Sequence, residues 1–577
     1  MNPEISSDSS RPAEAGREAL RRTYRETDLA LSELYYRIQV NSEDPAQQFS
    51  PMFLPTAENM ASARAEYDRL SAAVRDLPAP DPVFAVVKKH YLDFLDSLEY
   101  ALNEAEQHPE SLYLAFDSVL EAISRCNRQP DDERYAGVRK LLAERTAAAD
   151  TALALIHART APADLPDLAA SLRASAPAVL AEIPRIPSYF PGFSAGQVQG
   201  LQEDFRNYAG LLQRMADDLS PAPEKTPGPG SAEPNRAAQP EDLSRRMKMK
   251  PEEYRALLSR QLGVSLDDML SWYQSEIEKT RAEVFRIARS LDIPEKPETM
   301  QDIADILFKY EPPCRSAEEM YARANQYLQR TRKVAHEYVR LPEDEICTCV
   351  PLPEYCRSSY PWGGYEGGDF RYRPFRGQMF LNQYNVRNIS DGWIKLNSLH
   401  EAYPGHHVQY VRTATDIRPE TVKIGTKLIP VLEGTTLRTE KAFEDTFAED
   451  PFFPLFVAYR RHHGSVRIAV DLKMFYYGAP LSEVIDLYQR ELGFDDVTAR
   501  AQVQSHENTP GYFTCYYYGM KKLTSWEKEY GWSKKDFTEL LFSVGYICID
   551  RVEEILRLTP EERTRLFTEF GSLRKRN

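Results

Sequence analysis

Apolar residues recur three and four positions apart along most of this chain, with charged residues between them. That spacing puts the apolar side chains on one face of an α-helix and predicts amphipathic helices. In the first part of the chain the predicted helices span residues 16–40, 57–76, 82–107, 110–127, 133–160, 165–183 and 196–218. Helical spacing resumes at 251–262, 265–292, 298–310 and 316–338, and again from 393 to the C-terminus, with breaks near 415–425, 448–454 and 506–514. We therefore expect a mainly α fold.

Two stretches interrupt the helical pattern. Residues 220–246 are rich in proline and contain no aromatic residue, so they bury too little apolar surface to offset the entropy lost on ordering. We predict a flexible linker there, between an N-terminal helical lobe of residues 1–219 and a second helical lobe of residues 247–577. Residues 342–390 combine glycines, aromatic residues and β-formers, which indicates loops and a short β-sheet.

Composition narrows the class of protein. The formal net charge is −15 and the pI is about 5.4, which argues against nucleic acid as a partner. No window approaches the ~18 consecutive apolar residues of a membrane span, and the N-terminal residues are polar. We therefore expect a soluble, cytoplasmic protein without a membrane partner.

The seven cysteines are an odd and scattered set. Such a set suits reduced thiols in the cytoplasm better than a disulfide framework. Cys347, Cys349 and Cys356 lie close together in the sequence but lack a fourth ligand at a familiar spacing. We interpret them as structural residues.

The densest cluster of metal-binding and acid–base side chains lies in one octet. It reads His400-Glu401-Ala402-Tyr403-Pro404-Gly405-His406-His407, in a chain with ten histidines in all. The octet is similar to a stretched H-E-x-x-H motif, in which two histidines hold Zn²⁺ and the glutamate beside the first activates a water. This pattern predicts a site for one zinc ion, with His400 as a ligand and Glu401 as the general base.

The spacing of these histidines requires a break in the helix. Residues four apart share a helix face with a rise of about 6 Å, whereas seven residues rise about 10.5 Å, too far for two bonds of ~2.1 Å to one zinc. Pro404 and Gly405 supply the distortion, because proline disfavours helical geometry and glycine permits unusual backbone angles. We expect a two-residue bulge that makes His406 the second ligand. A three-residue bulge would select His407 instead, and the remaining histidine would orient the site or face substrate.

A catalytic zinc needs a third protein ligand and an open position for water. The best candidate stretch is residues 433–440, because Glu433 and Glu440 lie seven positions apart and share a helix face. We choose Glu433 as the ligand, with Glu440 as its alternative or as a residue that orients a ligand. Glu444 is a weaker candidate.

The octet and Gln409 resemble the hallmark H-E-x-x-P-G-H-H-x-Q of a large bacterial family, domain of unknown function eight hundred and eighty-five. Other segments of that family resemble residues 377–382, Glu433-Gly434 with Glu440, and Pro510-Gly511 with Tyr516 and Gly519. The family is grouped with gluzincin-type zinc metallopeptidases. The resemblance implies a zincin-like helical fold, with a short β-sheet beside the active-site helix and a cleft between helical lobes, and zinc-dependent peptidase or amidase activity.

The chain departs from the family pattern in segments expected to face substrate. Thr435 and Arg438 replace a tryptophan and a tyrosine, Tyr512 replaces a glutamine, and Phe475 replaces a histidine. The metal set is kept, so these departures leave specificity open.

The predicted chemistry is metal-assisted hydrolysis of short peptides. Glu401 would take a proton from water and pass it to the leaving amine. Tyr516, which matches a family tyrosine, would stabilise the oxyanion. Two alternatives stay open: a non-catalytic metal-binding or scaffold protein, and a metal-dependent hydrolase of non-peptide amides. Retention of Glu401 favours catalysis, because a structural metal site needs no base.

Three further groups lie near the motif segments. His506 precedes Pro510 and is a candidate to face the site. His462 and His463 follow two arginines, and we interpret them as part of a solvated helix face. We interpret Arg467 as a structural salt-bridge residue, with binding of a peptide carboxylate as the alternative.

Overall fold

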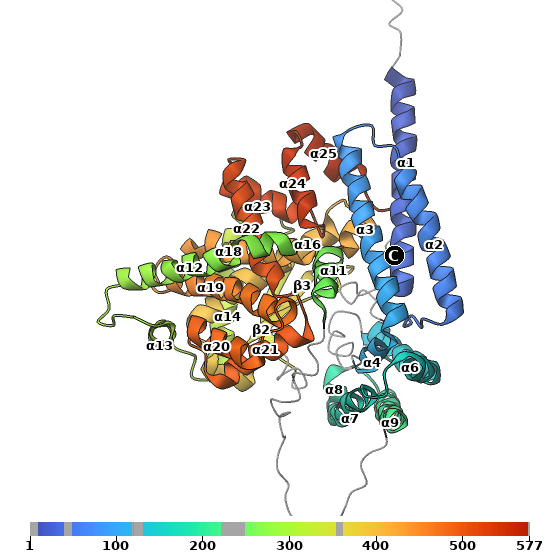
Figure 1. The fold of residues 1–577 in the computed structure, drawn as a ribbon, viewed down its shortest axis with the longest axis horizontal. Coiled ribbons are helices and arrows are strands. Elements are labelled where there is room, and N and C mark those ends of the chain that lie inside the picture. Colours follow the sequence, from blue (N-terminus) through green and yellow to red (C-terminus); the bar gives the residue numbers. More distant parts are fainter. Residues whose placement is uncertain are drawn as a thin grey trace, which may run out of the picture.

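Helices make up most of the structure, together with one small β-sheet (Figure 1). The computed structural model describes residues 10–39, 49–117, 119, 131–190, 192–220, 249–353 and 362–574. The prediction of a mainly α fold is confirmed. The predicted linker of residues 220–246 lies outside the described residues except for Ser220, and so does Cys356.

Three long helices begin the described chain and lie side by side at the right of Figure 1. They are α1 (Ser10–Ile38), α2 (Ala57–Asp76) and α3 (Pro82–Gln107). The side chain of Thr56 caps α2 by accepting a hydrogen bond from the N–H of Asn59, and Asp81 caps α3 in the same way. Tyr24, Phe84 and Phe94 lie in the core that these helices share.

A second group of helices has a core of its own. It comprises η1 (Pro109–Ser111), α4 (Leu112–Asp117), α6 (Asp131–Arg159), α7 (Leu165–Glu182), η3 (Ile183–Arg185), α8 (Ile186–Tyr189) and α9 (Ala195–Leu219). Phe116, Leu172 and Phe205 are fully buried in this core. The predicted helix at 110–127 is described only through Asp117 and at residue 119.

The largest group follows residue 249. Before the sheet it contains α11 (Pro251–Ala256), η4 (Leu257–Leu262), α12 (Leu266–Ser290), α13 (Met300–Tyr310) and α14 (Ala317–Tyr338). After the sheet come η6 (Gln383–Asn388), α15 (Asp391–Asn397), η7 (Ser398–Ala402), α16 (His406–Thr415), α17 (Glu420–Ile424), α18 (Ile429–Ala442), η8 (Glu444–Phe447) and α19 (Phe453–Asp471). The chain ends with η9 (Leu472–Tyr476), α20 (Leu481–Leu492), α21 (Asp496–Asn508), α22 (Thr514–Glu529), α23 (Lys534–Ser543), α24 (Ile549–Arg557) and α25 (Pro560–Glu569). Helices α18, α19 and α22 pack together at its centre.

The predicted breaks agree with these helices with one exception. No described helix spans residues 448–452 or 509–513, as the sequence predicted. The break predicted near 415–425 instead contains the short helix α17.

The predicted short sheet has three strands, β1 (Glu345–Pro351), β2 (Gly363–Gly367) and β3 (Phe375–Leu381). Their order is β1-β3-β2, with β1 parallel and β2 antiparallel to β3. Side chains alternate along β1, so that Glu345, Cys347 and Cys349 point into the protein. The two cysteines are free thiols in an apolar core, which agrees with their structural interpretation.

The first three helices are joined to the C-terminal part of the chain. Ile424 and Phe570 complete the core of α1, α2 and α3. The carboxylate of Asp28, on α1, accepts hydrogen bonds from the N–H groups of Glu420 and Thr421 at the start of α17, at 2.6 and 3.0 Å. The lobe boundary near residue 219 stays a prediction, and these contacts cross it.

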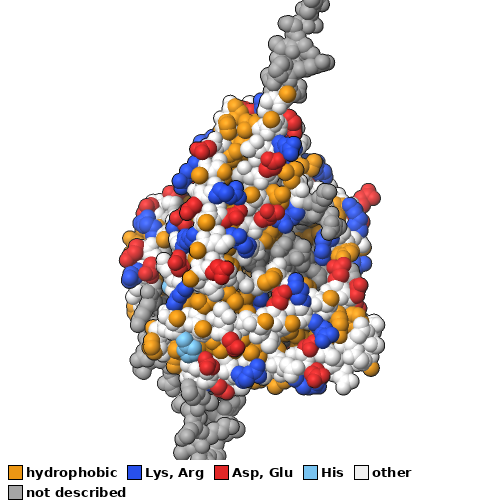
Figure 2. All heavy atoms as spheres, turned by 90° about the vertical axis from the view of Figure 1, so that its right-hand side faces the viewer, with side chains coloured by type: hydrophobic (Ala, Val, Ile, Leu, Met, Phe, Trp, Pro, Cys, Tyr) orange, Lys and Arg blue, Asp and Glu red, His pale blue; other side chains and the backbone are white. Residues whose placement is uncertain are grey.

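The described surface carries both signs of charge. On the face that includes α1, α2 and α3, basic and acidic side chains are interspersed (Figure 2). None of the described helices combines the length and apolar character that a bilayer crossing requires.

Candidate metal centre

The helix that carries His400 ends in a wide turn. Helix α15 continues into five π-helical residues, η7, closed by a 2.9 Å hydrogen bond from the N–H of Tyr403 to the carbonyl oxygen of Ser398. A new helix, α16, begins at His406. The structure therefore contains a helix break at Pro404 and Gly405, where the sequence predicted one.

Gly405 lets the chain fold back against the preceding turn. A Cβ atom at this position would lie 2.0 Å from the carbonyl oxygen of His400 and 2.4 Å from that of Leu399. Both are backbone atoms, so only glycine allows this approach. As a result the ring centroids of His400 and His406 lie 5.0 Å apart.

The break brings two histidines to one glutamate of α18. Nε2 of His400 lies 3.3 Å from Oε2 of Glu433, and Nε2 of His406 lies 3.4 Å from the same oxygen. The three ligand atoms lie within 4.8 Å of one another, and all three residues are buried. Among the described residues this is the one such group of histidine, cysteine and acidic side chains.

These distances suit a tetrahedral cation. Donors about 2.1 Å from a tetrahedral zinc lie about 3.4 Å from each other, close to both distances at Glu433. Oε2 of Glu433 is buried and has no hydrogen-bond partner in the described structure. A buried carboxylate oxygen without a partner is costly unless a cation neutralises it, so the donor set fits a metal ion.

Each candidate ligand is oriented by a second side chain. Nδ1 of His400 is 2.7 Å from Oε1 of Glu440, and Nδ1 of His406 is 2.8 Å from Oε1 of Gln409. The hydroxyl of Tyr512 donates to Oε1 of Glu433 at 2.7 Å. Partners of this kind hold the ligand atoms of metal sites in place. The structure thus puts Glu440 in the orienting position that the sequence offered as its second role.

Glu444 does not reach the cluster. Its carboxylate accepts a hydrogen bond from Lys441 at 2.6 Å, outside the group formed by His400, His406 and Glu433. The hydroxyl of Thr436 does contact the cluster, because it lies 3.2 Å from Nε2 of His400.

The electrostatics of the cluster favour positive charge. Burial opposes the charged form of His400, but the adjacent carboxylates of Glu433 and Glu440 raise its pKa to about 10. Burial likewise opposes protonation of His406, and the charge of Glu433 nevertheless raises its pKa. Burial would raise the pKa of Glu433, yet the two histidines hold it well below its usual range. A divalent cation would compete for this position with the protons on the imidazoles.

His407 turns away from the cluster. Its Nε2 lies 2.7 Å from Oε2 of Glu345 on β1, and its Nδ1 lies 2.9 Å from the hydroxyl of Tyr365 on β2. Burial is the main cause of its lowered pKa. A neutral ring that donates from Nε2 and accepts at Nδ1 satisfies both contacts. His407 therefore attaches α16 to the sheet.

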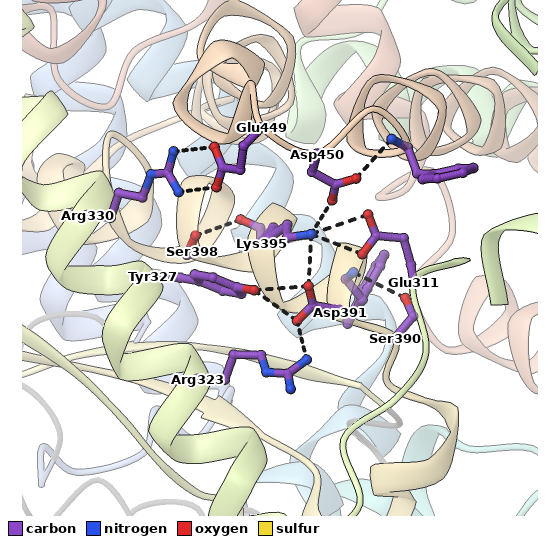
Figure 3. A network of polar contacts seen from close by, with 12 residues as sticks. Glu311, Arg323, Tyr327, Arg330, Ser390, Asp391, Lys395, Ser398, Glu449 and Asp450 are labelled. Carbon is purple, nitrogen blue, oxygen red and sulfur yellow. Dashed lines mark hydrogen bonds and ion pairs between the residues drawn. The ribbon is translucent and has the colours of Figure 1, made fainter. Parts of the chain in front are cut away.

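A buried network holds α15 ahead of the turn (Figure 3). Nζ of Lys395 lies 3.1 Å from Glu311 and 2.8 Å from Asp391, and also contacts Asp450. The hydroxyl of Tyr327, on α14, donates to both oxygens of Asp391 at 3.0 Å. Burial and the hydrogen bond with Asp450 raise the pKa of Glu311 to about 9. The network holds α15 in place at Lys395, which lies five residues before His400.

The two predicted catalytic residues lie beside the cluster. Glu401 is partly exposed, and its negative charge contributes to the raised pKa values of His400 and His406. The ring of Tyr516 stacks on that of His400, with centroids 6.2 Å apart and planes inclined by 10°. Its hydroxyl is 3.4 Å from that of Tyr512. The sequence analysis noted Tyr512 only because it replaces a glutamine of the family pattern. It did not predict the hydrogen bond from Tyr512 to Glu433.

The other residues that differ from the family pattern are buried in the protein core. Thr435 and Arg438 are buried, and Arg438 pairs with Glu527. Phe475 stacks on Tyr254 with ring centroids 5.6 Å apart. These residues therefore belong to the core around α18 and η9 and do not line the cluster.

Three predictions for the flanking residues were wrong. His462 and His463 are 0% and 3% exposed, so they do not form a solvated helix face; helices packed on α19 cover them. His506 is buried between Asp471 and Tyr488, at 2.6 and 2.7 Å, and is not part of the cluster. Arg467 has no described carboxylate within ion-pair distance and donates instead to Gln502 at 3.2 Å. A sequence window shows the polarity of one helix but not what packs against it.

Comparison with known proteins places this architecture in a family. The sequence matches "Bacterial protein of unknown function (DUF885)" over residues 38–555. The chain belongs to this family. No curated protein matches it.

Two solved structures share the fold of this family member. A putative lipoprotein from Colwellia psychrerythraea has a TM-score of 0.69 and 16% sequence identity, covering 95% of this chain and 99% of its own. A putative lipoprotein of unknown function from Shewanella oneidensis has a TM-score of 0.65 and 12% identity, covering 93% of this chain and 98% of its own. At these identities the likeness shows the fold and not the activity.

Proposed function

We propose that this family member is a zinc-dependent hydrolase of short peptides. The observation that carries the proposal is the convergence of His400 Nε2, His406 Nε2 and Glu433 Oε2 within 4.8 Å, beside the carboxylate of Glu401. Two imidazoles and one carboxylate are a common donor set of catalytic zinc sites in hydrolases. When bound, zinc polarises a carbonyl group and makes water nucleophilic at neutral pH.

The protein's own residues would divide the remaining work. Glu401 accepts the proton of the attacking water and delivers it to the leaving amine. The hydroxyl of Tyr516 is the nearby candidate to donate to the oxyanion, and that of Tyr512 holds Glu433 in place. Glu440 and Gln409 hold the two imidazoles in the orientation in which Nε2 faces Glu433.

The cytoplasm remains our proposed compartment. The five described cysteines are all free and buried, as expected for a reducing environment. Two structural relatives are described as lipoproteins, so attachment to a membrane surface is the alternative. Fractionation of cells that express the full-length protein distinguishes the two.

Replacement of the proposed base tests the hydrolase. Glu401→Gln should bind zinc like the wild type, because Glu401 is not among the three ligands, while hydrolysis falls by about 10²- to 10⁴-fold. Zinc is measured by elemental analysis, and hydrolysis by mass spectrometry of a dipeptide and tripeptide library. Glu337→Gln is the matched control, because Glu337 also follows a histidine but is exposed.

Each other result has a definite meaning. An unchanged rate in Glu401→Gln removes this residue from the mechanism. Zinc in the protein with no product from any peptide favours a non-catalytic binding protein. Hydrolysis of acylated amines or amino-acid conjugates, with peptides left intact, favours a hydrolase of non-peptide amides.

A further inference from the structure

Two buried arginines of α19 lie beside the candidate metal centre. Arg460 and Arg467 are each 6% exposed. Their guanidinium carbons lie 5.7 and 5.6 Å from the centre of the Tyr516 ring, and that ring stacks on His400. Both guanidinium groups and His400 therefore contact the same aromatic ring.

Among the described carboxylates, only that of Glu440 lies within 4 Å of these arginines, beside Arg460. Nε of Arg460 is 3.8 Å from Oε1 of Glu440, too far for a hydrogen bond, and its Nε and Nη1 are buried without a hydrogen-bond partner. Nη2 of Arg467 donates to Gln502 at 3.2 Å, and its Nε is buried without a partner. Buried charges in proteins are normally paired and hydrogen-bonded. Arg460 has one long ion pair and Arg467 has none with a described carboxylate, so the compensation at both is incomplete.

Buried arginines elsewhere in the chain differ in how fully they are paired. Arg412 is 1% exposed and uses all three of its nitrogen atoms, which donate to Asp416, Glu539 and Ser543. Arg134, Arg145 and Arg418 each keep one buried nitrogen without a hydrogen-bond partner. What sets Arg460 and Arg467 apart is therefore their place beside the Tyr516 ring and His400.

The neighbouring His463 responds to the charge of the two arginines. Its Nε2 is buried and has no hydrogen-bond partner. Burial, and then the charges of Arg467 and Arg460, hold its pKa well below its usual value. Burial lowers the pKa of Arg467, and the charge of Arg460 lowers it further. The surroundings of the two arginines therefore disfavour a further positive charge and favour an anion.

We propose that Arg460 and Arg467 bind the C-terminal carboxylate of the peptide substrate. Guanidinium groups recognise carboxylates by paired, charge-assisted hydrogen bonds. The rings that lie against the two arginines, Phe513 and Tyr516, are partly exposed, as is Tyr512, so solvent reaches the rings that cover the two guanidinium groups. The inference rests on the proposed hydrolase and specifies which end of the peptide it binds.

The position of the arginines restricts the bond that is cut. An extended peptide advances about 3.3–3.6 Å per residue. A carboxylate held by arginines that contact the same ring as His400 places the cleaved bond about one to three residues from the C-terminus. The expected products are single amino acids or very short C-terminal fragments.

The test compares one tripeptide library as free acids and as C-terminal amides. The wild type should hydrolyse the acids about 10- to 100-fold faster, the usual worth of hydrogen bonds between charged groups. Arg460→Met and Arg467→Met should reduce this preference to near unity, mainly by slowing hydrolysis of the acids. Arg412→Met is the control: it should keep the preference and lower Tm, because it breaks a fully paired arginine.

Stability and binding supply readouts that do not depend on turnover. Arg467→Met should not lower Tm below that of the wild type, because it removes an unpaired buried charge. In the Glu401→Gln background the acid library should raise Tm and the amide library should not, and Arg467→Met should abolish the shift. Amides that keep an Asp or Glu side chain test whether a side-chain carboxylate suffices.

The outcomes separate the two proposals. Hydrolysis of acids and amides at equal rates overturns the carboxylate site and leaves the hydrolase intact. A Tm shift by acids alone, lost in Arg467→Met, without hydrolysis of any peptide supports the carboxylate site and overturns the peptidase. Equal shifts by acids and amides, or a shift by neither, overturn the carboxylate site. A preference for side-chain carboxylates overturns its assignment to the C-terminus.

Discussion

His406 and His407 are neighbours in the sequence, yet their rings face different carboxylates. His406 faces Glu433 on α18, and His407 faces Glu345 on β1. Successive residues of a helix point about 100° apart, so α16 can present only one of the two to His400. Gly405 decides which one, because it sets where the new helix begins.

Replacement of each histidine by glutamine distinguishes their roles. His406→Gln should weaken zinc binding by more than about 100-fold, because even residues that only orient ligands contribute 10- to 100-fold. His407→Gln should keep zinc but lose about 1–3 kcal/mol of stability, because the buried Glu345 and Tyr365 lose a partner. Zinc titration and denaturant unfolding measure the two effects. Zinc lost equally in both variants would contradict this assignment.

At the scale of elements, one carboxylate holds the turn between His400 and His406 against the sheet and α14. Oε2 of Glu345 lies 2.7 Å from both His407 and the hydroxyl of Tyr403, while Oε1 lies 2.6 Å from Arg332. Burial would raise the pKa of Glu345, but His407, Tyr403 and Arg332 lower it to about 2. Strand β1 thereby binds both sides of the turn that contains Pro404.

This carboxylate should make stability depend on acid. Its folded-state pKa of about 2 lies below the usual 4.5, so its contribution is fully present above about pH 4.5 and is lost as the pH falls towards 2. Glu345→Gln should cost about 3 kcal/mol at neutral pH, because it breaks a buried charge network. The unfolding free energy of the Glu345→Gln variant should then change less between pH 4.5 and pH 2 than that of the wild type.

Denaturant unfolding at several pH values measures this difference. The control is Glu343→Gln, since Glu343 is exposed. Equal pH dependence in Glu345→Gln and the control would show that Glu345 does not supply the acid sensitivity.

At the scale of the whole molecule, the N-terminal helices support the part of the chain that carries the cluster. Asp28 of α1 caps α17, and its carboxylate also accepts a 2.6 Å hydrogen bond from the hydroxyl of Thr421. Helix α17 directly precedes α18, which supplies Glu433. The contact couples two segments almost 400 residues apart in sequence.

Loss of this contact should be detected far from α1. Asp28→Ala removes a buried acceptor that three donors share and should cost about 3 kcal/mol. All five tryptophans lie at residue 272 or beyond, so tryptophan fluorescence reports only on the later part of the chain. If α1 unfolds cooperatively with that part, the fluorescence midpoint in denaturant shifts with the mutation.

The control for this experiment is Asp150→Ala, an exposed position on α6, which should change stability by less than about 0.5 kcal/mol. An unchanged fluorescence midpoint in Asp28→Ala, with an earlier transition in circular dichroism, would mean that α1, α2 and α3 unfold separately.

Local patterns were enough to predict most of the helices, the short sheet and the break inside the octet. Apolar periodicity reports which face of a helix is buried, and Pro404 with Gly405 reports where a helix cannot continue. The same reasoning selected His400, His406 and Glu433 as candidate ligands, and the structure brings these three together. Their role as zinc ligands is still a proposal.

Contacts between distant segments could not be read from such patterns. The pairing of His407 with Glu345, the burial of His462 and His463, and the cap that Asp28 forms on α17 each depend on which elements pack together. The buried nitrogens of Arg460 and Arg467 that have no hydrogen-bond partner are of the same kind, because a missing partner is a property of the surroundings. Periodicity and turn residues act over a few positions of the backbone, whereas burial and charge pairing arise only when the chain has folded.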